Sequence, residues 1–100
     1  MNKQNASAVT YGNIIFFKKD ATVSDVLEEV HHFYQNKTGL NIKHRAKQRI
    51  ILNEIDAKEY VLSMSDKYNI PKEEIELTKI QLKNYINEMN KMKERGEWID

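Results

Sequence analysis

The sequence predicts a mostly helical α+β domain, in which a short N-terminal strand or hairpin precedes three helices, the last two an antiparallel pair. A run of β-branched and aromatic residues near the N-terminus is typical of a strand, and apolar residues recur with helical spacing over most of the remaining chain. The one proline, Pro71, divides the longest helical stretch. One hundred residues provide for a single domain with a modest core.

The strand is expected over about residues 13–18, Asn-Ile-Ile-Phe-Phe-Lys. Its apolar run is continuous, which is typical of a strand covered on both faces. Because a lone strand leaves its backbone groups unpaired, it needs a partner: either residues 5–11 as a hairpin arm, or a second chain in a homodimer. Residues 1–8 are small and polar and are expected to fray.

The first helix is expected over about residues 23–36. Thr22 and Asp25 fit a capping box that begins it, and the segment up to Gly39 supplies turn residues that end it. Its apolar residues share one stripe, which is predicted to face the core. They are Val23, Val26, Leu27, Val30, Phe33 and Tyr34.

The second helix is expected over about residues 42–68, a stretch without Gly or Pro. Asn69-Ile70-Pro71 should stop it, because the residue before a proline is driven out of the α region. The third helix is expected over about residues 72–94. Residues 97–100 form a tail whose Trp98 is expected to pack on the helices.

Composition limits the classes of function. The chain has no Cys, so any metal site must use His and carboxylate ligands, and no thiolate nucleophile is present. The formal net charge of +1 gives no overall attraction to nucleic acid or membrane. No apolar run reaches the length of a membrane span, and the N-terminus lacks the apolar run of a signal peptide, so a cytoplasmic location is expected.

Reactive side chains are concentrated in the first helix. Glu28 and His32 are one turn apart and share a face nearly opposite the apolar stripe. If the helix is covered on both sides, this pair points into a cleft and can bind one divalent cation. In the second helix Glu54 lies at the centre of the apolar stripe, where a carboxylate needs a partner, either a metal ion or Lys58.

A plainer interpretation stands beside this one. Residues opposite an apolar stripe are usually solvated, and Glu28 with His32 is then an ordinary surface pair. Glu54 with Lys58 is then a structural ion pair. Residue spacing alone favours this interpretation, because Glu and Lys are common throughout the chain.

Two segments carry a resemblance to a known family. Glu28-Glu29-Val30-His31-His32-Phe33-Tyr34-Gln35 and Asn53-Glu54-Ile55-Asp56-Ala57-Lys58-Glu59-Tyr60-Val61-Leu62 resemble the zincin-like metallopeptidase toxin domains of bacterial polymorphic toxin systems. Those domains have a Glu-Glu-x-x-His-x-x-Gln helix, then an acid-Ala-x-Glu-Tyr helix, a proline-containing turn and a last helix. The resemblance covers about residues 13–92. It implies zinc as the cofactor and metal-dependent hydrolysis of a peptide.

The resemblance implies a role for four residues. Glu28 stands in the place of the first His of His-Glu-x-x-His, His32 is the second metal ligand and Glu54 the downstream ligand. Glu29 is the catalytic general base that activates water. Glu in place of His makes a harder and weaker zinc site. The chain could therefore also be an inactive copy of such a domain.

Two other functions remain open. The first is a non-catalytic phage or mobile-element protein that binds and inhibits a host protein such as a defence nuclease, suggested by the small size of the chain. The second is contact with nucleic acid or an acidic protein through a basic run without acidic residues, although a solvated helix start is the commoner meaning of such a run. The run contains Lys37, Lys43, His44, Arg45, Lys47 and Arg49, of which Lys43, Arg45, Lys47 and Arg49 are the candidate partner-binding residues.

Overall fold

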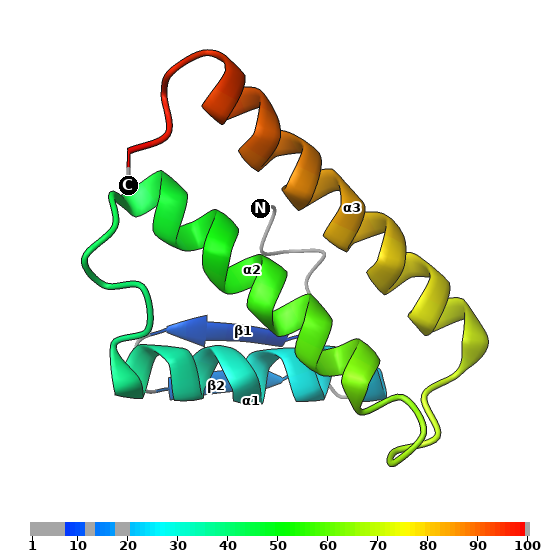
Figure 1. The fold of residues 1–100 in the computed structure, drawn as a ribbon. Helices are drawn as coiled ribbons and strands as arrows, with labels where there is room; N and C mark the ends of the chain where they lie inside the picture. Colours follow the sequence, from blue (N-terminus) through cyan, green and yellow to red (C-terminus); the bar gives the residue numbers. More distant parts are fainter. Residues whose placement is uncertain (1–7, 12–13, 18–20, 100) are drawn as a thin grey trace.

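The computed structural model describes residues 8–11, 14–17 and 21–99 (Figure 1). The elements are β1 (Ala8–Tyr11), β2 (Ile14–Phe17), α1 (Val23–Thr38), α2 (Ala46–Ser63) and α3 (Lys72–Glu94). β1 and β2 pair antiparallel, with Ala8 opposite Phe17 and Tyr11 opposite Ile14. Of the residues predicted to fray, 1–7 lie outside the described ranges and Ala8 belongs to β1.

The predicted α+β class is wrong. Residues 21–99 are 72% helical and contain no strand, so this part of the chain is a three-helix fold. The prediction treated the N-terminal segment as a separate β layer of the fold. β1 and β2 have four residues each. The helix against which they mainly pack is α1. A two-stranded ladder of this length cannot enclose a core, whereas the helices pack on one another.

α2 is the central helix of the fold. In Figure 1 it runs between α1 and α3, and it packs against both. α3 runs antiparallel to α2 after the turn that contains Pro71. α1 and α3 meet near their N-terminal ends, where the backbone N–H and the hydroxyl of Ser24 donate to Glu74 Oε1 at 3.0 and 2.7 Å. From that point the two helices diverge, so α2 is flanked on both sides.

The helix ends follow local backbone chemistry. α1 begins at Val23 with the predicted capping box of Thr22 and Asp25, and α3 spans the predicted range. α2 is shorter than predicted at both ends. Before it, Gly39 caps α1 at φ 70° and Asn41 adopts φ 60°, and after it Asn69 adopts φ 50°. Asn tolerates this left-handed conformation, so these two residues can turn the chain in the segments that flank α2.

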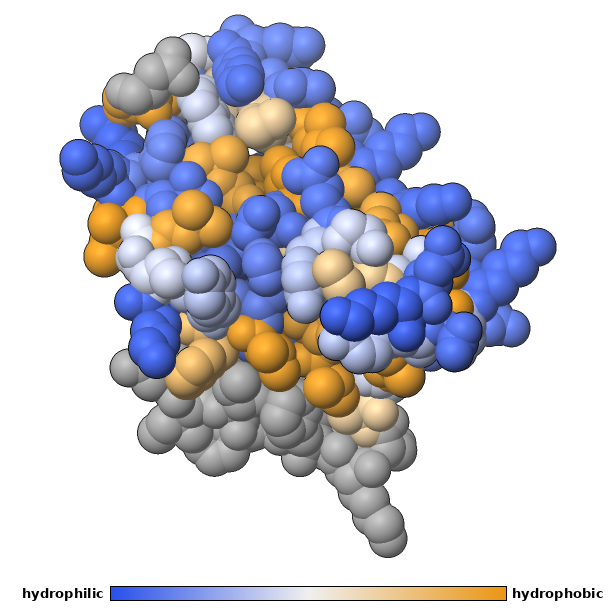
Figure 2. Space-filling model, turned by 60° about the horizontal axis from the view of Figure 1, so that its bottom comes forward, coloured by the Kyte–Doolittle hydropathy of each residue, from blue (hydrophilic) through white to orange (hydrophobic). Residues whose placement is uncertain are grey.

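The predicted apolar stripe of α1 is only partly buried in the described residues. Val30 and Tyr34 are 47% and 62% exposed, and Leu27 and Phe33 are half-buried, whereas the fully buried residues of α1 are Ser24 and Gln35. The polar face of α1 meets α2, so the apolar stripe points away from α2. Hydrophobic residues also reach the surface in patches separated by hydrophilic ones in Figure 2. Among the residues whose burial is described, the buried apolar side chains are Ile51, Ala57 and Val61 of α2 together with Ile70 and Met92.

The C-terminal tail packs on the start of α2, as predicted for Trp98. Gln48 is 1% exposed, and its side chain forms two bonds with the backbone of Ile99. Gln48 Nε2 donates to the Ile99 carbonyl at 2.6 Å, and Gln48 Oε1 accepts from the Ile99 N–H at 3.0 Å. Lys93 Nζ lies 5.6 Å from the centre of the Trp98 ring. The Gln48 amide therefore pairs with both the N–H and the carbonyl of one residue of the tail, as a residue of a neighbouring β-strand would.

Candidate functional site

Four charged side chains form a closed arrangement between α1 and α2. Glu28 and His32 from α1 face Glu54 and Lys58 from α2, and each pair is one helical turn apart. The short contacts are His32 Nε2 to Glu54 Oε1 at 2.5 Å and Lys58 Nζ to Glu28 Oε1 at 2.6 Å. The longer ones are His32 to Glu28 and Lys58 to Glu54, both 3.7 Å. We call these four residues the charged quartet.

The quartet is largely buried. Its side chains are between 7% and 19% exposed, so the predicted solvated surface pair of Glu28 and His32 is not what the structure has. Positive and negative groups alternate around it, and each carboxylate contacts both cations. Burial of charges at this depth requires such pairing. Among the described residues, every buried side-chain nitrogen and oxygen atom has a hydrogen-bond partner.

Gln35 fixes the orientation of the His32 ring. Gln35 Nε2 donates to the Asn53 carbonyl at 2.8 Å and to Asp56 Oδ2 at 2.9 Å, so Gln35 Oε1 is left to face His32. It accepts from His32 Nδ1 at 2.7 Å, which requires a proton on Nδ1. His32 Nε2 consequently points at the carboxylates of the quartet. Histidines that bind metals are held in the same way through their second nitrogen.

The quartet shifts the acid–base behaviour of its members. Burial opposes a charge on His32, but the carboxylates of Glu28 and Glu54 outweigh it and raise the pKa of His32 to about 10. Burial likewise opposes the charge of Glu54, yet its bond with His32 and the charges of His32 and Lys58 lower the pKa of Glu54. His32 is therefore an imidazolium at neutral pH.

Two further side chains adjoin the quartet. Tyr85 of α3 lies near Glu54, and burial together with the charge of Glu54 raises the pKa of Tyr85 to about 12. Asp56 bonds to His31 Nε2 at 2.7 Å as well as to Gln35. His31 stacks on Tyr60, with ring centres 4.3 Å apart. The site thus involves residues from all three helices.

The predicted site residues come together. Glu28, Glu29 and His32 each offer a ligand atom, and these atoms lie within 4.8 Å of one another. Glu54 is not one of this group, but its Oε1 pairs with His32 Nε2 at 2.5 Å. One imidazole nitrogen and several carboxylate oxygens suit a divalent ion such as zinc, so the donor set fits the metal that the resemblance implies. The ammonium of Lys58 lies next to these ligand atoms, 2.6 Å from Glu28 Oε1.

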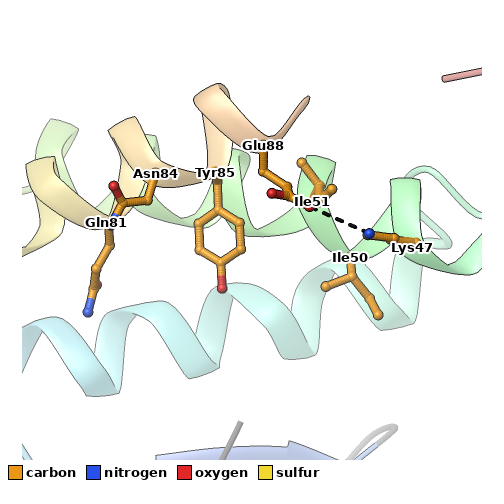
Figure 3. A pocket seen from close by; sticks show the side chains of 7 residues that line it. All are labelled: Lys47, Ile50, Ile51, Gln81, Asn84, Tyr85 and Glu88. Carbon is orange, nitrogen blue, oxygen red and sulfur yellow. Dashed lines mark ion pairs between the residues drawn. The ribbon is translucent and has the colours of Figure 1, made fainter. Parts of the chain in front are cut away.

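A groove lies between α2 and α3. It has a volume of about 500 Å³, and Tyr85, whose pKa the charge of Glu54 raises, is one of its lining residues. Figure 3 shows Tyr85 projecting from α3 between Gln81 on one side and Ile50 on the other. The remaining lining residues are Lys47, Ile51, Asn84 and Glu88. The groove combines apolar side chains with two amides that can bond to a peptide backbone.

The candidate partner-binding residues lie at the start of α2 and before it. Lys43, Arg45 and Lys47 are exposed and Arg49 is half-buried. Lys47 Nζ lies 3.5 Å from Glu88 Oε1, so an acidic side chain of α3 balances one charge of the basic run. The first turn of α2 contains no acidic residue.

Comparisons of the chain with protein-family models, with curated proteins and with solved structures found no match. The likeness to zincin-like toxin domains therefore stays a prediction from the residue pattern. Within the described ranges, none of the helices is both long enough and apolar enough for a membrane crossing.

Sequence reasoning missed three residues of the site. The spacing of Gln35 three positions after His32 is a signal that could have identified it as the partner of the ring. Tyr85 and Asp56 were not among the candidate residues. No sequence signal for these two was available, because their contacts depend on how the helices cross.

Proposed function

We propose that this chain is a zincin-like domain of toxin type that binds one divalent metal ion, zinc in the first instance, and hydrolyses a peptide bond. One observation carries the proposal. Glu28, Glu29 and His32 offer ligand atoms that lie within 4.8 Å of one another, and Glu54 of α2 is the ion-pair partner of His32. The resemblance assigns Glu28, His32 and Glu54 as the ligands and Glu29 as the general base.

Each residue has a part in the proposed chemistry. Glu28, His32 and Glu54 would hold the ion, and His32 Nε2 would have to release the proton that it directs at Glu54 before it could act as a ligand. Bound zinc polarises a carbonyl group and lowers the pKa of water at the site. Gln35 keeps His32 Nδ1 occupied, so His32 Nε2 is the nitrogen that meets the ligand position. Glu29, whose carboxylate belongs to the same 4.8 Å group, would accept the proton of the attacking water.

The groove provides a place for the substrate. An extended peptide could lay an apolar side chain against Ile50 and Ile51 while Gln81 and Asn84 bond to its backbone. Tyr85 lines the groove and lies near Glu54, so its hydroxyl could donate a hydrogen bond to the carbonyl under attack. A protein or peptide is therefore the proposed substrate class.

A second candidate is a non-catalytic domain that binds and inhibits a host protein in the cytoplasm. The position of Lys58 favours this candidate, because its ammonium already balances the carboxylates of Glu28 and Glu54 without a metal ion. An acidic protein surface could then meet Lys43, Arg45 and Arg49. Nucleic acid is less favoured, since Glu88 balances Lys47. The pairing of β2 with β1 removes the reason for expecting a homodimer through the strand.

A zinc titration combined with a peptide-cleavage assay tests the first candidate. The wild type should bind one zinc ion, and His32→Ala and Glu54→Gln should lose that site. Glu29→Gln should retain the zinc site and lose cleavage. Glu59→Gln, which removes an exposed carboxylate of α2, is the matched control and should change neither. Zinc binding that survives both ligand substitutions, or that is absent up to millimolar zinc, would favour the non-catalytic candidate.

A further inference from the structure

We propose that Lys58 is an internal competitor for the metal: its ammonium fills the charged quartet in the metal-free protein and must be displaced for an ion to bind. The inference rests on the function proposed above for the same residues. It concerns how strongly the chain holds a metal, and it adds a residue that the ligand set does not include.

The position of Lys58 carries the inference. Its side chain is 7% exposed, and its Nζ lies 2.6 Å from Glu28 Oε1 and 3.7 Å from Glu54 Oε2. Those are two of the three proposed ligands. Lysine is rarely buried to this extent unless carboxylates surround it. The ammonium therefore satisfies the same oxygen atoms that a divalent ion would need.

An ammonium and a metal ion cannot both be held at this place. Glu28 Oε1 is already within hydrogen-bond distance of Lys58, and two positive charges a few ångströms apart repel strongly in a partly buried site. Lysine has a long and flexible side chain, and its withdrawal from the quartet is part of the proposal.

Removal of the Lys58 charge should therefore have two opposite effects. Without metal, Lys58→Met leaves Glu28 and Glu54 without their ammonium partner, and the protein becomes less stable. With zinc, the same variant has lost its competitor. Its zinc affinity should rise at least about tenfold, the scale on which groups next to metal ligands alter affinity. A residue with a purely structural role would produce the first effect alone.

The experiment compares wild type, Lys58→Met, Lys58→Arg and the exposed control Lys83→Met. Zinc affinity is measured by calorimetry, and the melting temperature is measured with and without zinc. We expect Lys58→Met to bind zinc at least about tenfold tighter than wild type and to show the lowest melting temperature without zinc and the largest rise with it. Lys58→Arg, which keeps a cation, should bind no tighter than wild type, and Lys83→Met should match it.

Equal or weaker zinc binding by Lys58→Met would overturn the inference. If that variant does not fold without zinc, Lys58→Gln replaces it, because its amide can still donate to Glu28. Failure here is distinguishable from failure of the proposed function. A wild type that binds zinc tightly through His32, with no gain in Lys58→Met, removes this inference alone. Tight binding by Lys58→Met without any peptide cleavage removes the hydrolase alone.

Discussion

His32 Nε2 lies 2.5 Å from Glu54 Oε1, so an ion pair rather than an apolar contact closes the centre of the α1–α2 interface. Both side chains are less than 20% exposed. A buried pair of this kind adds little over a well-packed apolar pair, but losing one partner leaves the other charge buried and uncompensated. The stability of the fold should therefore depend on both partners and on their protonation.

Replacement of His32 by Ala should destabilise the fold by about 3 kcal/mol, because it leaves Glu54 facing Glu28 without the imidazolium. Glu54→Gln should cost a similar amount. The double variant should cost clearly less than the sum, since the two residues share one interaction. Urea unfolding of the two single variants and the double variant measures this coupling. Strictly additive losses would show that the two side chains do not interact in the folded protein.

Stability should decrease as the pH rises above neutrality. Against burial, Glu28 and Glu54 raise the pKa of His32 from 6.5 to about 10, so between these values the folded state holds a proton that the unfolded state releases. The contribution of His32 is complete below pH 6.5 and is lost as the pH rises toward 10. The slope should approach ~1.4 kcal/mol per pH unit.

The contribution of Glu54 to stability depends on pH in the opposite direction. Its pKa is lowered from 4.5, so its contribution is present above pH 4.5 and is lost as the pH falls further. The maximum of stability should therefore lie between these two regions. Urea unfolding across the pH range tests both limbs, and His32→Ala should flatten the alkaline one. An alkaline limb of unchanged slope in His32→Ala would mean that another group causes it.

Gln35→Met should cost about 2 kcal/mol, because it keeps the length of the side chain but leaves His32 Nδ1 and the Asn53 carbonyl without their bonds. The variant should also weaken zinc binding, since the ring of His32 is no longer held. Gln81→Met, in the groove wall, is the control and should leave zinc binding unchanged. Urea unfolding and zinc calorimetry provide the two measurements. Unchanged zinc affinity in Gln35→Met would show that the ring is held by other contacts.

Gln48→Ala should release the C-terminal tail. The variant removes both bonds to the backbone of Ile99, so Trp98 should become more exposed to water. Trp98 is the only tryptophan of the chain, so its fluorescence reports the tail directly. We expect its emission to shift to longer wavelength while α-helical circular dichroism is retained. An unchanged emission spectrum would show that the contact with Lys93 holds Trp98 by itself.

Local sequence signals predicted the parts of the fold that depend on neighbouring residues. The capping box at Thr22, the turn at Gly39 and the span of α3 are of this kind. The ends of α2 were predicted too far out: the helix spans Ala46–Ser63, and no capping side chain marks where it begins.

The orientation of α1 could not be predicted from its own pattern. An apolar stripe normally faces the core, but α2 presents Glu54 and Lys58, which complement Glu28 and His32. Which face of α1 is buried therefore depends on a partner helix distant in sequence. For the same reason the ligand candidates could be named from the motif, whereas the place of Lys58 among them required the structure.

The zinc K-edge X-ray absorption spectrum of the zinc-loaded protein tests the proposed metal centre most directly. We predict a first shell of nitrogen and oxygen atoms at about 2.0–2.2 Å that includes one imidazole, and loss of the imidazole signal in His32→Ala. A spectrum without imidazole, or one that is unchanged in His32→Ala, would contradict a metal centre formed by Glu28, His32 and Glu54.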